Sequence, residues 1–189
     1  AKLLGVRGVS GPSANRFGRV SPTRIEHVQI EFGPDLAVLD GGPCQVGIES
    51  TIVDCTRADP VLLRPGMLTP KVLSDSAGMQ VWLPQDAAWW AGAAPKASGT
   101  LASHYAPNAR VRLVSVEEMS AMAQPMAMAQ RQQIGVWSPQ APSWPGPSWK
   151  PMPTQADLCA HDLFDVLRQF ESQGMQEIWV CPPPPGPEW

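Results

Sequence analysis

Residues 154–181 read "TQADLCAHDLFDVLRQFESQGMQEIWVC", a sequence that predicts a helix followed directly by a strand. Apolar residues recur there at the spacing of three and four that places them on one helix face, namely Leu163, Phe164, Leu167 and Phe170. Thr154, with Asp157 three residues later, is typical of a helix start, and Gly174 is typical of a helix end. Residues 175–181 form a strand pattern, so the apolar helix face is available to cover a sheet.

Strands and helices also alternate upstream of this segment. Residues 109–115 and 133–138 are strand patterns, and an Ala- and Met-rich helix at about 116–131 lies between them. Pro125 is expected to kink or break that helix. A loop rich in Pro and Trp at 139–153 completes the order strand, helix, strand, loop, helix, strand, which predicts a small parallel α/β domain.

The first part of the chain, up to about residue 83, predicts short strands and brief helices. Its strand patterns lie at 36–40, 49–55 and 60–64, and a short helix is expected at 68–76. Pro65 and Gly66 suit the two central positions of a type II turn. Residues 1–9 are typical of a helix tail followed by a turn or a short strand.

A change of composition separates the two parts. Residues 84–103 have no sustained apolar period and are dominated by Ala, Gly, Pro and Ser, which predicts an interdomain linker. Trp89 and Trp90 are expected to anchor this linker by packing against a domain surface.

The composition is that of a globular protein, with 43% hydrophobic and 16% charged residues. The 22 prolines and 16 glycines predict many fixed turns and at least one linker. The net charge is −3, so the chain lacks the basic footprint that binding to a phosphate backbone requires. A nucleic acid is therefore not expected as a direct partner.

The cysteines lie far apart and form no CxxC pair, which predicts reduced thiols in a cytosolic protein, with neither a zinc site nor a disulfide framework. No apolar run approaches the roughly 18 residues of a membrane span, and the N-terminus lacks the layout of a signal peptide. The chain begins at Ala1 and ends in "CPPPPGPEW" just after an expected strand. We therefore expect a fragment that is cut at both ends.

Polar clusters in the first part and the linker are candidates for ligand binding. They are residues 10–21, 47–51, 64–66 and the sequence "SHYAP" at 103–107. Ser21 is expected at a helix N-terminus, with either Ser21 or Thr23 as the cap, where free backbone amides favour an anion. Arg64 adds a cation whose planar fork suits a phosphate or a carboxylate. The clusters together predict a site for an anionic, hydroxyl-rich ligand such as a nucleotide.

Each candidate also has a plainer interpretation. The polar stretch could be an ordinary loop, and Arg64 could simply pair with Asp40 or Glu49. Glu49 could instead point outward from a strand and have no role. His104 and Tyr105 could only pin the linker to the first domain.

Hydrolytic chemistry is not favoured by the sequence. Ser50, His104 and an aspartate supply the residue types of a catalytic triad, but the GxSxG elbow is missing and Ser50 lies in a β-branched strand pattern. The three histidines are isolated, and neither HExxH nor a pair of carboxylates suggests a protein metal site.

Four sequence strings together resemble one protein family. They are "PSANRFGRVSPT" at 12–23, "DGGPCQVGIESTIVD" at 40–54, "LLRPGMLTP" at 62–70 and "SHYAPNARV" at 103–111. In this order and at this spacing they resemble the YrdC-like threonylcarbamoyl-AMP synthases, in the long form that adds a linker and a C-terminal α/β domain. The resemblance covers about residues 1–115 by motif and the remainder by domain pattern.

The resemblance implies an α/β fold class with three parts. Residues 1–83 would be the C-terminal part of a YrdC-like α/β catalytic domain, and residues 84–108 a linker that serves as a lid and carries "SHYAP". Residues 109–189 would be a small Rossmann-like parallel α/β domain, which is incomplete at its C-terminus.

The implied activity is that of a nucleotidyltransferase. It would join L-threonine, bicarbonate or CO2, and ATP into L-threonylcarbamoyladenylate and release pyrophosphate, with Mg²⁺ accompanying the ATP. The product would pass to the cytoplasmic machinery that places N6-threonylcarbamoyl on adenosine 37 of tRNAs that read ANN codons. Catalysis is expected from holding the carbamate oxygen in line with the α-phosphate and neutralising charge, so no side chain is assigned as catalytic.

Matching motifs carry the implied binding residues. Those for ATP are Ser13, Asn15, Ser21, Arg64 and Tyr105. Those for L-threonine are Gly11 and Ser50. Asn15 would hold the loop or touch substrate, Arg64 would grip phosphates, and Tyr105 would close over the nucleotide to keep water from the labile carbamate.

The chain departs from the family pattern in several places. The N-terminal half of the family's catalytic domain, with its ATP-binding Lys and Arg, has no counterpart here. Gly11 stands where the family often has Ala, and Gln45 stands where Pro is frequent, which are both mild changes. We therefore expect this chain to be inactive by itself and the function to belong to a full-length parent.

Two other functions are open alternatives. A YrdC-like module could bind double-stranded RNA or tRNA without catalysis, which an early cluster of basic residues favours and the net charge of −3 opposes. That cluster is Arg7, Arg16, Arg19 and Arg24. A carbamoyl-transfer maturation factor of the hydrogenase type shares the domain, but it is expected to carry zinc-finger and acylphosphatase segments upstream and to lack the "SHYAP" linker.

Overall fold

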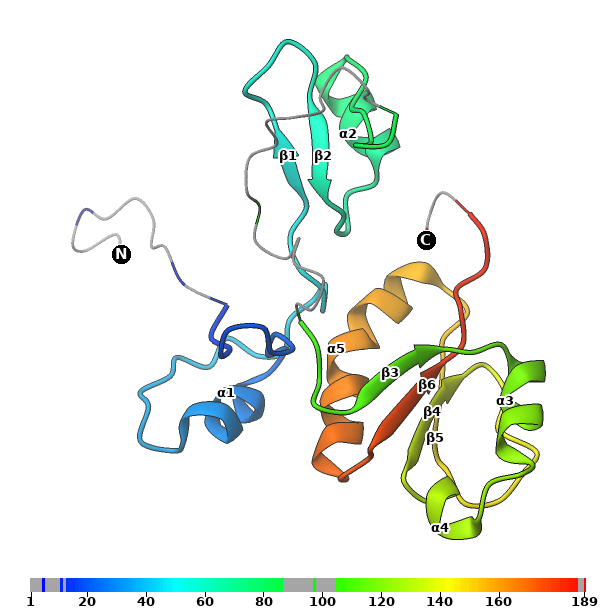
Figure 1. Cartoon of the computed structure of the whole chain (residues 1–189). Helices are drawn as coiled ribbons and strands as arrows, with labels where there is room; N and C mark the ends of the chain where they lie inside the picture. Colours follow the sequence, from blue (N-terminus) through cyan, green and yellow to red (C-terminus); the bar gives the residue numbers. More distant parts are fainter. Residues whose placement is uncertain (1–4, 6–10, 12, 87–96, 98–104, 187–188) are drawn as a thin grey trace.

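The computed structural model describes residues 5, 11, 13–86, 97, 105–186 and 189. Its C-terminal part contains a four-stranded parallel sheet, and its N-terminal part contains a two-stranded antiparallel sheet (Figure 1). The fold is α/β, as the sequence predicts.

The strands of the C-terminal sheet follow the order β3-β6-β4-β5. Their bounds are Arg110–Leu113 for β3, Ile134–Ser138 for β4, Ser148–Pro151 for β5 and Glu177–Val180 for β6. The structure confirms the predicted strands for β3, β4 and β6. The prediction of a loop at 139–153 is wrong at β5, which pairs with β4 at the edge of the sheet, where a proline such as Pro151 need not donate a hydrogen bond.

Helices α3 (Val116–Ala123) and α5 (Ala156–Ser172) cover opposite faces of this sheet, and the one-turn helix α4 (Met128–Arg131) lies between α3 and β4 in the chain. The predicted break at Pro125 is confirmed, because α3 ends before it and α4 begins after it. Gln155, rather than Thr154, is the N-cap of α5 and makes no side-chain capping bond, so the expected start is one residue early.

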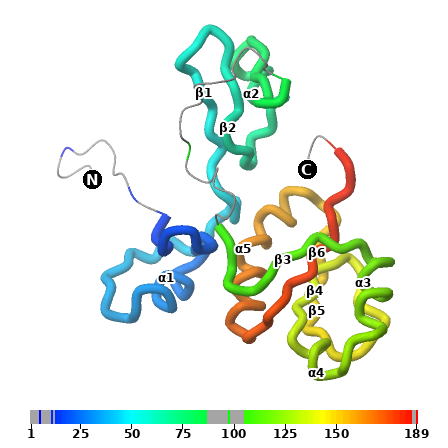
Figure 2. Tube along the Cα trace, in the orientation of Figure 1, coloured from blue at the N-terminus to red at the C-terminus, as the bar shows by residue number. Residues whose placement is uncertain are grey.

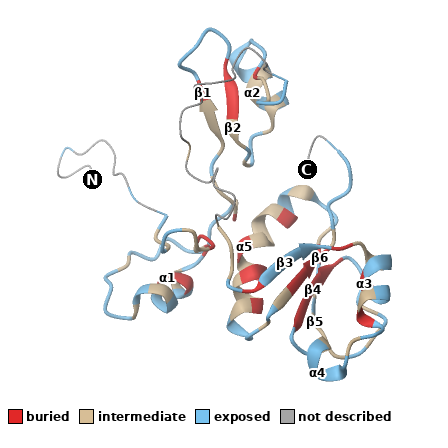
Figure 3. Cartoon of the chain, in the orientation of Figure 1, coloured by how far each residue is buried: buried red, intermediate tan, exposed pale blue. Residues whose placement is uncertain are grey.

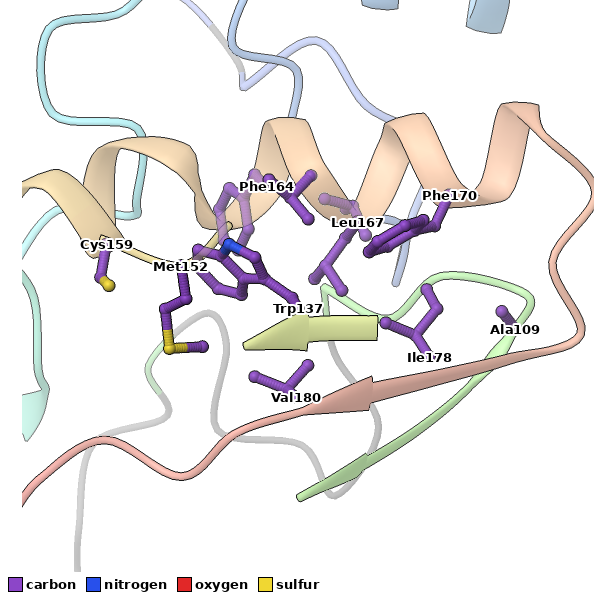
Figure 4. Close-up of a cluster of buried hydrophobic side chains, with 11 residues drawn as sticks. Ala109, Trp137, Met152, Cys159, Phe164, Leu167, Phe170, Ile178 and Val180 are labelled. Atoms are coloured by element: carbon purple, nitrogen blue, oxygen red, sulfur yellow. The ribbon is translucent and has the colours of Figure 1, made fainter. Parts of the chain in front are cut away.

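Apolar side chains fill the space between α5 and the sheet (Figure 4). Phe170 of α5 and Ile178 of β6 are fully buried, and Trp137 of β4 is almost completely so. Gly135 lets the helix approach, because a Cβ there would lie 2.6 Å from the ring of Phe170. On the opposite face of the sheet, Trp179 packs with residues of α3, and the central strands are therefore the most buried part of the chain (Figure 3).

The N-terminal part carries two helices and a strand pair. Their bounds are Ile25–Phe32 for α1, Ile52–Asp54 for β1, Val61–Arg64 for β2 and Pro70–Ala77 for α2. The strands predicted at 49–55 and 60–64 and the helix predicted at 68–76 are confirmed. Thr69 caps α2 by accepting a hydrogen bond from Val72 N, with Pro70 as the first helical residue.

Three local predictions in this part are wrong. Residues 36–40 form no strand, and Leu39 is completely exposed, because no described segment pairs with it. Ser21 does not lie at a helix N-terminus, since the N-cap of α1 is Arg24. Gly66 lacks the positive φ of a type II turn, and its small size serves a close approach instead: a Cβ would lie 2.6 Å from Thr51 N.

Several predicted features lie outside the described residues. They include most of the expected helix tail at 1–9 and most of the linker at 84–103, with Trp89, Trp90 and His104. Among the helices of the described part, none has the combination of length and apolar character that a bilayer crossing requires.

The segment that carries α1 lies against α5 (Figure 2). Arg24 forms an ion pair with Asp165 of α5, and His27 Nε2 lies 3.3 Å from Asp165 Oδ1. Gly47 packs directly on the backbone of His161, where a Cβ would come within 2.0 Å of the carbonyl oxygen. The long C-terminal helix therefore supports the loops that hold the predicted binding residues.

Candidate functional site

A cleft of about 570 Å³ lies where the N-terminal loops meet α5. Its lining residues are Ser13, Ser21, Pro22, Thr23, Cys44, Gln45, Val46, Gly47, Ile48, Glu49 and Phe164. Two of the predicted nucleotide-binding residues, Ser13 and Ser21, are among them. Cys44 N donates a 2.8 Å hydrogen bond to Thr23 O, which ties two walls of the cleft together.

Glu49 connects this cleft to Arg64. Its Oε1 accepts a hydrogen bond from Ser21 Oγ, and its Oε2 lies 3.8 Å from Arg64 Nη2. The Glu49 side chain is 19% exposed, so the interpretation in which it points outward from a strand is wrong. Arg64 pairs with Glu49 rather than with Asp40, which accepts from Gly42 N within its own turn.

Arg64 gathers the predicted threonine-binding and lid residues around one guanidinium. Its Nε donates to Ser50 O at 2.9 Å and its Nη2 donates to Ser50 Oγ at 3.0 Å. Its Nη1 donates to the Tyr105 hydroxyl at 2.8 Å. The position at the end of β2 explains this reach, because β2 pairs with the strand that begins two residues after Ser50.

Tyr105 is held in place by both parts of the chain. Its ring centroid lies 6.0 Å from that of Phe164 on α5, and its backbone adopts a φ of 55°, in the left-handed region. Such a backbone is costly for a residue other than glycine and persists only where surrounding contacts enforce it. Burial, and then the Glu49 carboxylate, raise the pKa of the Tyr105 phenol, so the hydroxyl is protonated at neutral pH.

The remaining predicted residues face elsewhere. Asn15 Oδ1 accepts from Ser13 Oγ, and Asn15 Nδ2 donates to the carbonyls of Arg16 and Arg19, so this side chain folds its own loop. Gly11 is exposed, and no described atom outside its chain neighbours lies within 4 Å of where its Cβ would be. Glu49 thus links Ser21 to Arg64, and Arg64 binds Ser50 and Tyr105. Ser13 and Ser21 line the cleft, whereas Ser50, Arg64 and Tyr105 are not among its lining residues and Gly11 lies apart.

Glu49 is the residue that sequence reasoning missed. The available signal was its place directly before Ser50 in the second quoted string, "DGGPCQVGIESTIVD", but a pattern of neighbours does not show which way a side chain points. Only the contact between Ser21 and Glu49, which are 28 residues apart, shows that the carboxylate faces inward.

His27 supports the segment after Ser21 from the first turn of α1. Its Nδ1 accepts a 3.1 Å hydrogen bond from Thr23 N, so the neutral ring carries its proton on Nε2, toward Asp165. Burial is the largest cause that lowers the pKa of His27 below its ordinary 6.5, and the Arg168 and Arg24 cations act in the same direction. The Asp165 and Glu26 carboxylates oppose this shift without reversing it.

This geometry predicts a loss of stability on mild acidification. The unfolded chain binds a proton on His27 below about pH 6.5, whereas the folded chain resists it, so the free energy of unfolding falls as the pH drops. His27→Asn keeps an acceptor for Thr23 N but does not titrate, and should flatten this dependence between about pH 7.5 and 5.5. We expect it to cost about 1 kcal/mol at neutral pH.

Urea unfolding at a series of pH values measures this effect. Gln29→Asn on the exposed face of α1 is the matched control, because it changes no titratable group and should leave the slope unchanged. An undiminished pH slope in His27→Asn would contradict the assignment.

Metal binding by the protein alone is not indicated in the described part of the chain, where no three His, Cys, Asp or Glu side chains come together as ligands. Glu49 is the single carboxylate that lines the described cleft. One carboxylate is fewer than a resident metal in a protein cage requires.

Comparison with known proteins gives two family matches. Residues 63–189, which are more than half of the chain, match the family described as threonylcarbamoyl-AMP synthase, C-terminal domain. Residues 2–66 match the Sua5/YciO/YrdC family, which is described as telomere recombination.

Curated relatives carry the same name. The threonylcarbamoyl-AMP synthase of Pyrococcus abyssi is 38% identical over 112 residues, which are 59% of this chain and 33% of that protein. The threonylcarbamoyl-AMP synthase of Schizosaccharomyces pombe is 30% identical over 191 residues, which cover 91% of this chain and 47% of that protein. The chain therefore spans about half the length of these relatives or less.

Solved structures show the same fold. The crystal structure of P. abyssi Sua5 complexed with L-threonine aligns with a TM-score of 0.69 and 28% identity, and covers 89% of this chain and 51% of that one. A variant of the same protein, in which a histidine and the tyrosine after it are replaced by alanine, aligns with a TM-score of 0.68. From the family match over residues 63–189, we conclude that the chain belongs to the threonylcarbamoyl-AMP synthase family.

Proposed function

We propose that this chain carries the substrate-binding part of an L-threonylcarbamoyladenylate synthase. The reaction would join L-threonine, bicarbonate or CO2, and ATP, and release pyrophosphate. Family membership supports this proposal, and the observation that carries it is the set of hydrogen bonds from Arg64 to Ser50 and Tyr105. That set brings the residue expected for threonine and the residue expected for the nucleotide to one cation.

The roles of the individual residues follow from their positions. Ser13 and Ser21, at the 570 Å³ cleft, would bind the nucleotide, and Asn15 would hold their loop. Ser50 would bind L-threonine, a ligand with which the P. abyssi neighbour was crystallised. Gly11 is retained as a threonine contact on the motif alone.

Arg64 pairs with Glu49, which accepts from Ser21, and donates to Ser50, so we propose that the new bond would form near its guanidinium. The threonine nitrogen would attack the carbon of CO2 and release a proton, or attack the carbon of bicarbonate with loss of water. An oxygen of the resulting carbamate would then attack the α-phosphorus as pyrophosphate leaves. Arg64 donates to protein acceptors in this structure, so we expect phosphate oxygens to share or replace some of these bonds. A guanidinium in this place would orient both reactants and neutralise the negative charge that develops.

Tyr105 would serve as the closing element. The chain contains one tyrosine, and it follows His104, so His104-Tyr105 is the counterpart in residue type of the pair replaced in the P. abyssi variant. The hydrogen bond to Arg64 and the packing on Phe164 would hold the Tyr105 ring over the site, where it excludes water from the carbamate.

Mg²⁺ would enter the site with ATP. Glu49 is the described residue whose carboxylate could contact it, while the phosphates would supply most of the oxygen ligands. When bound, the ion would neutralise charge on the phosphates, and Glu49 would continue to orient Ser21.

The product would pass to the machinery that attaches threonylcarbamoyl to adenosine 37 of tRNA in the cytoplasm. Direct binding of tRNA has less support, because Arg19 pairs with Glu171 and Arg24 with Asp165. Two members of the early basic cluster are thereby neutralised. The family match at 63–189 likewise favours a synthase over a carbamoyl-transfer maturation factor.

Pyrophosphate release tests the proposal. The protein expressed from its complete gene should release pyrophosphate from ATP only when L-threonine and bicarbonate are both present, and mass spectrometry should detect threonylcarbamoyladenylate. Pyrophosphate release that does not depend on threonine would refute the proposed reaction. Tight tRNA binding with a steep salt dependence and no such turnover would favour the RNA-binding alternative.

A further inference from the structure

Arg168 of α5 reaches across to the backbone of the nucleotide-binding segment. Its Nη2 donates to Val20 O, and its Nε donates to Ser21 O at 3.3 Å. The Arg168 side chain is only 10% exposed, and the side chains of Val20 and Ser21 are buried. A planar guanidinium that donates to two successive carbonyls fixes the path of the chain at that point.

An ion pair holds the guanidinium in this orientation. Glu31 Oε2 accepts from Arg168 Nη2 at 2.7 Å, and the Glu31 side chain is 7% exposed. The other oxygen of Glu31 accepts from Arg16 N, so the same carboxylate also anchors the loop that contains Asn15. Burial raises the pKa of Glu31, but these hydrogen bonds and the Arg168 charge outweigh it, so the carboxylate is ionised at neutral pH.

A second contact from α5 acts on the segment that follows Tyr105. Glu171, three residues after Arg168 and on the same helix face, pairs with Arg19 and accepts a 2.9 Å hydrogen bond from Asn108 N. Ala106 N in turn donates to Gly18 O at 3.0 Å. One face of α5 therefore holds both the segment before Ser21 and the segment after Tyr105.

The cleft along this face, about 840 Å³ in volume, is lined by many charged groups of both signs. Those with described ion pairs are Arg19 with Glu171, Arg24 with Asp165, and Arg168 with Glu31. Because these charges satisfy one another, the cleft is better explained as a docking seam between two parts of the chain than as a ligand site.

We propose that Arg168 is a positioning residue through which the C-terminal domain sets the geometry of the nucleotide site; this rests on the proposed function. Arg168 holds the carbonyl of Ser21, the hydroxyl of Ser21 donates to Glu49, and Glu49 faces Arg64. Removal of the guanidinium would leave two buried carbonyls without these donors and free the segment to shift. Displacement of a binding group by about 1 Å weakens binding and catalysis strongly.

The test compares Arg168→Met, Arg168→Lys and Arg110→Met in the protein expressed from its complete gene. Arg168→Met should raise the KM for ATP by about tenfold or more and the KM for threonine by less than about twofold. Arg168→Lys keeps the charge but not the planar fork, so its KM for ATP should lie between those of Arg168→Met and the unaltered protein. Arg110→Met, whose side chain is 74% exposed in the same domain, should behave as the unaltered protein.

Amide hydrogen exchange gives a readout that does not depend on turnover. The amides of Ser21 and Thr23 should exchange faster in Arg168→Met than in the unaltered protein, while those of β4 and β6 should not change. If threonine-dependent release is absent in the unaltered protein, the proposed function fails, and exchange alone decides the positioning role. In Arg168→Met, a KM for ATP within about twofold of that of the unaltered protein, or unchanged exchange at Ser21 and Thr23, would overturn the positioning role.

Discussion

Arg64→Met should lower kcat/KM for threonine-dependent pyrophosphate release by about 100-fold or more. The substitution keeps a flexible apolar side chain but removes the donors to Ser50 O, Ser50 Oγ and the Tyr105 hydroxyl. It also leaves the Glu49 carboxylate, which is 19% exposed, without its cation. The measurement is steady-state pyrophosphate release at varied ATP and threonine in the protein expressed from its complete gene.

Conservative variants separate the charge of Arg64 from its geometry. Arg64→Lys should retain part of the activity, because an ammonium keeps the charge but cannot serve Ser50 and Tyr105 together. Tyr105→Phe keeps the ring and loses the hydrogen bond from Arg64, so the activity should fall by about tenfold or less. Arg110→Met is the matched control on the exposed edge strand β3. Full activity in Arg64→Met would remove the central residue of the proposed site.

Gly47→Ala should lower the free energy of unfolding by about 2–4 kcal/mol, as measured by urea denaturation. Gly47 has a φ of 78°, which alone disfavours a side chain, and a Cβ there would lie 2.0 Å from the carbonyl oxygen of His161. That oxygen belongs to the backbone of α5, so it cannot rotate away. The loop that contains Glu49 must then leave the helix, and the cleft should lose its shape.

Gly78→Ala is the control for the backbone effect. Gly78 has a φ of 66° at the C-terminus of α2, and no described atom outside its chain neighbours lies within 4 Å of its Cβ position. This substitution should cost about 1 kcal/mol through backbone conformation alone. Equal losses in the two variants would show that the contact with His161 contributes nothing to stability.

Local sequence patterns predicted correctly the helices whose stabilising interactions are local in sequence. The apolar residues of α5 recur at helical spacing, and Pro125 separates α3 from α4 because it cannot continue a helix. Edge strand β5 escaped prediction because its stability comes from pairing with β4, whereas the segment around it, 139–153, is rich in proline. Leu39 shows the converse, since an apolar pattern without a pairing strand remains an exposed loop.

The candidate site likewise contains residues that the sequence could identify and partners that only the structure identifies. The motif residues Ser13, Ser21, Ser50, Arg64 and Tyr105 could be named from the sequence, because residue type and spacing carry a resemblance to a family. The partners that orient them could not be named, because each contact joins distant positions. Glu49 meets Ser21 across 28 residues, and Arg168 meets Ser21 across 147.

The sequence by itself therefore determined the parallel α/β architecture of the C-terminal part and the residue types of a polar ligand site. Hydrophobic periodicity and turn chemistry act between near neighbours, so they can be read along the chain. Only the tertiary structure decided that Glu49 faces inward and that Ser21 lies before a helix rather than at its start. It also decided that side chains of α5 bind the loops that carry the candidate site. These outcomes depend on which distant surfaces pack together, and burial of a charged side chain is possible only where packing supplies its partner.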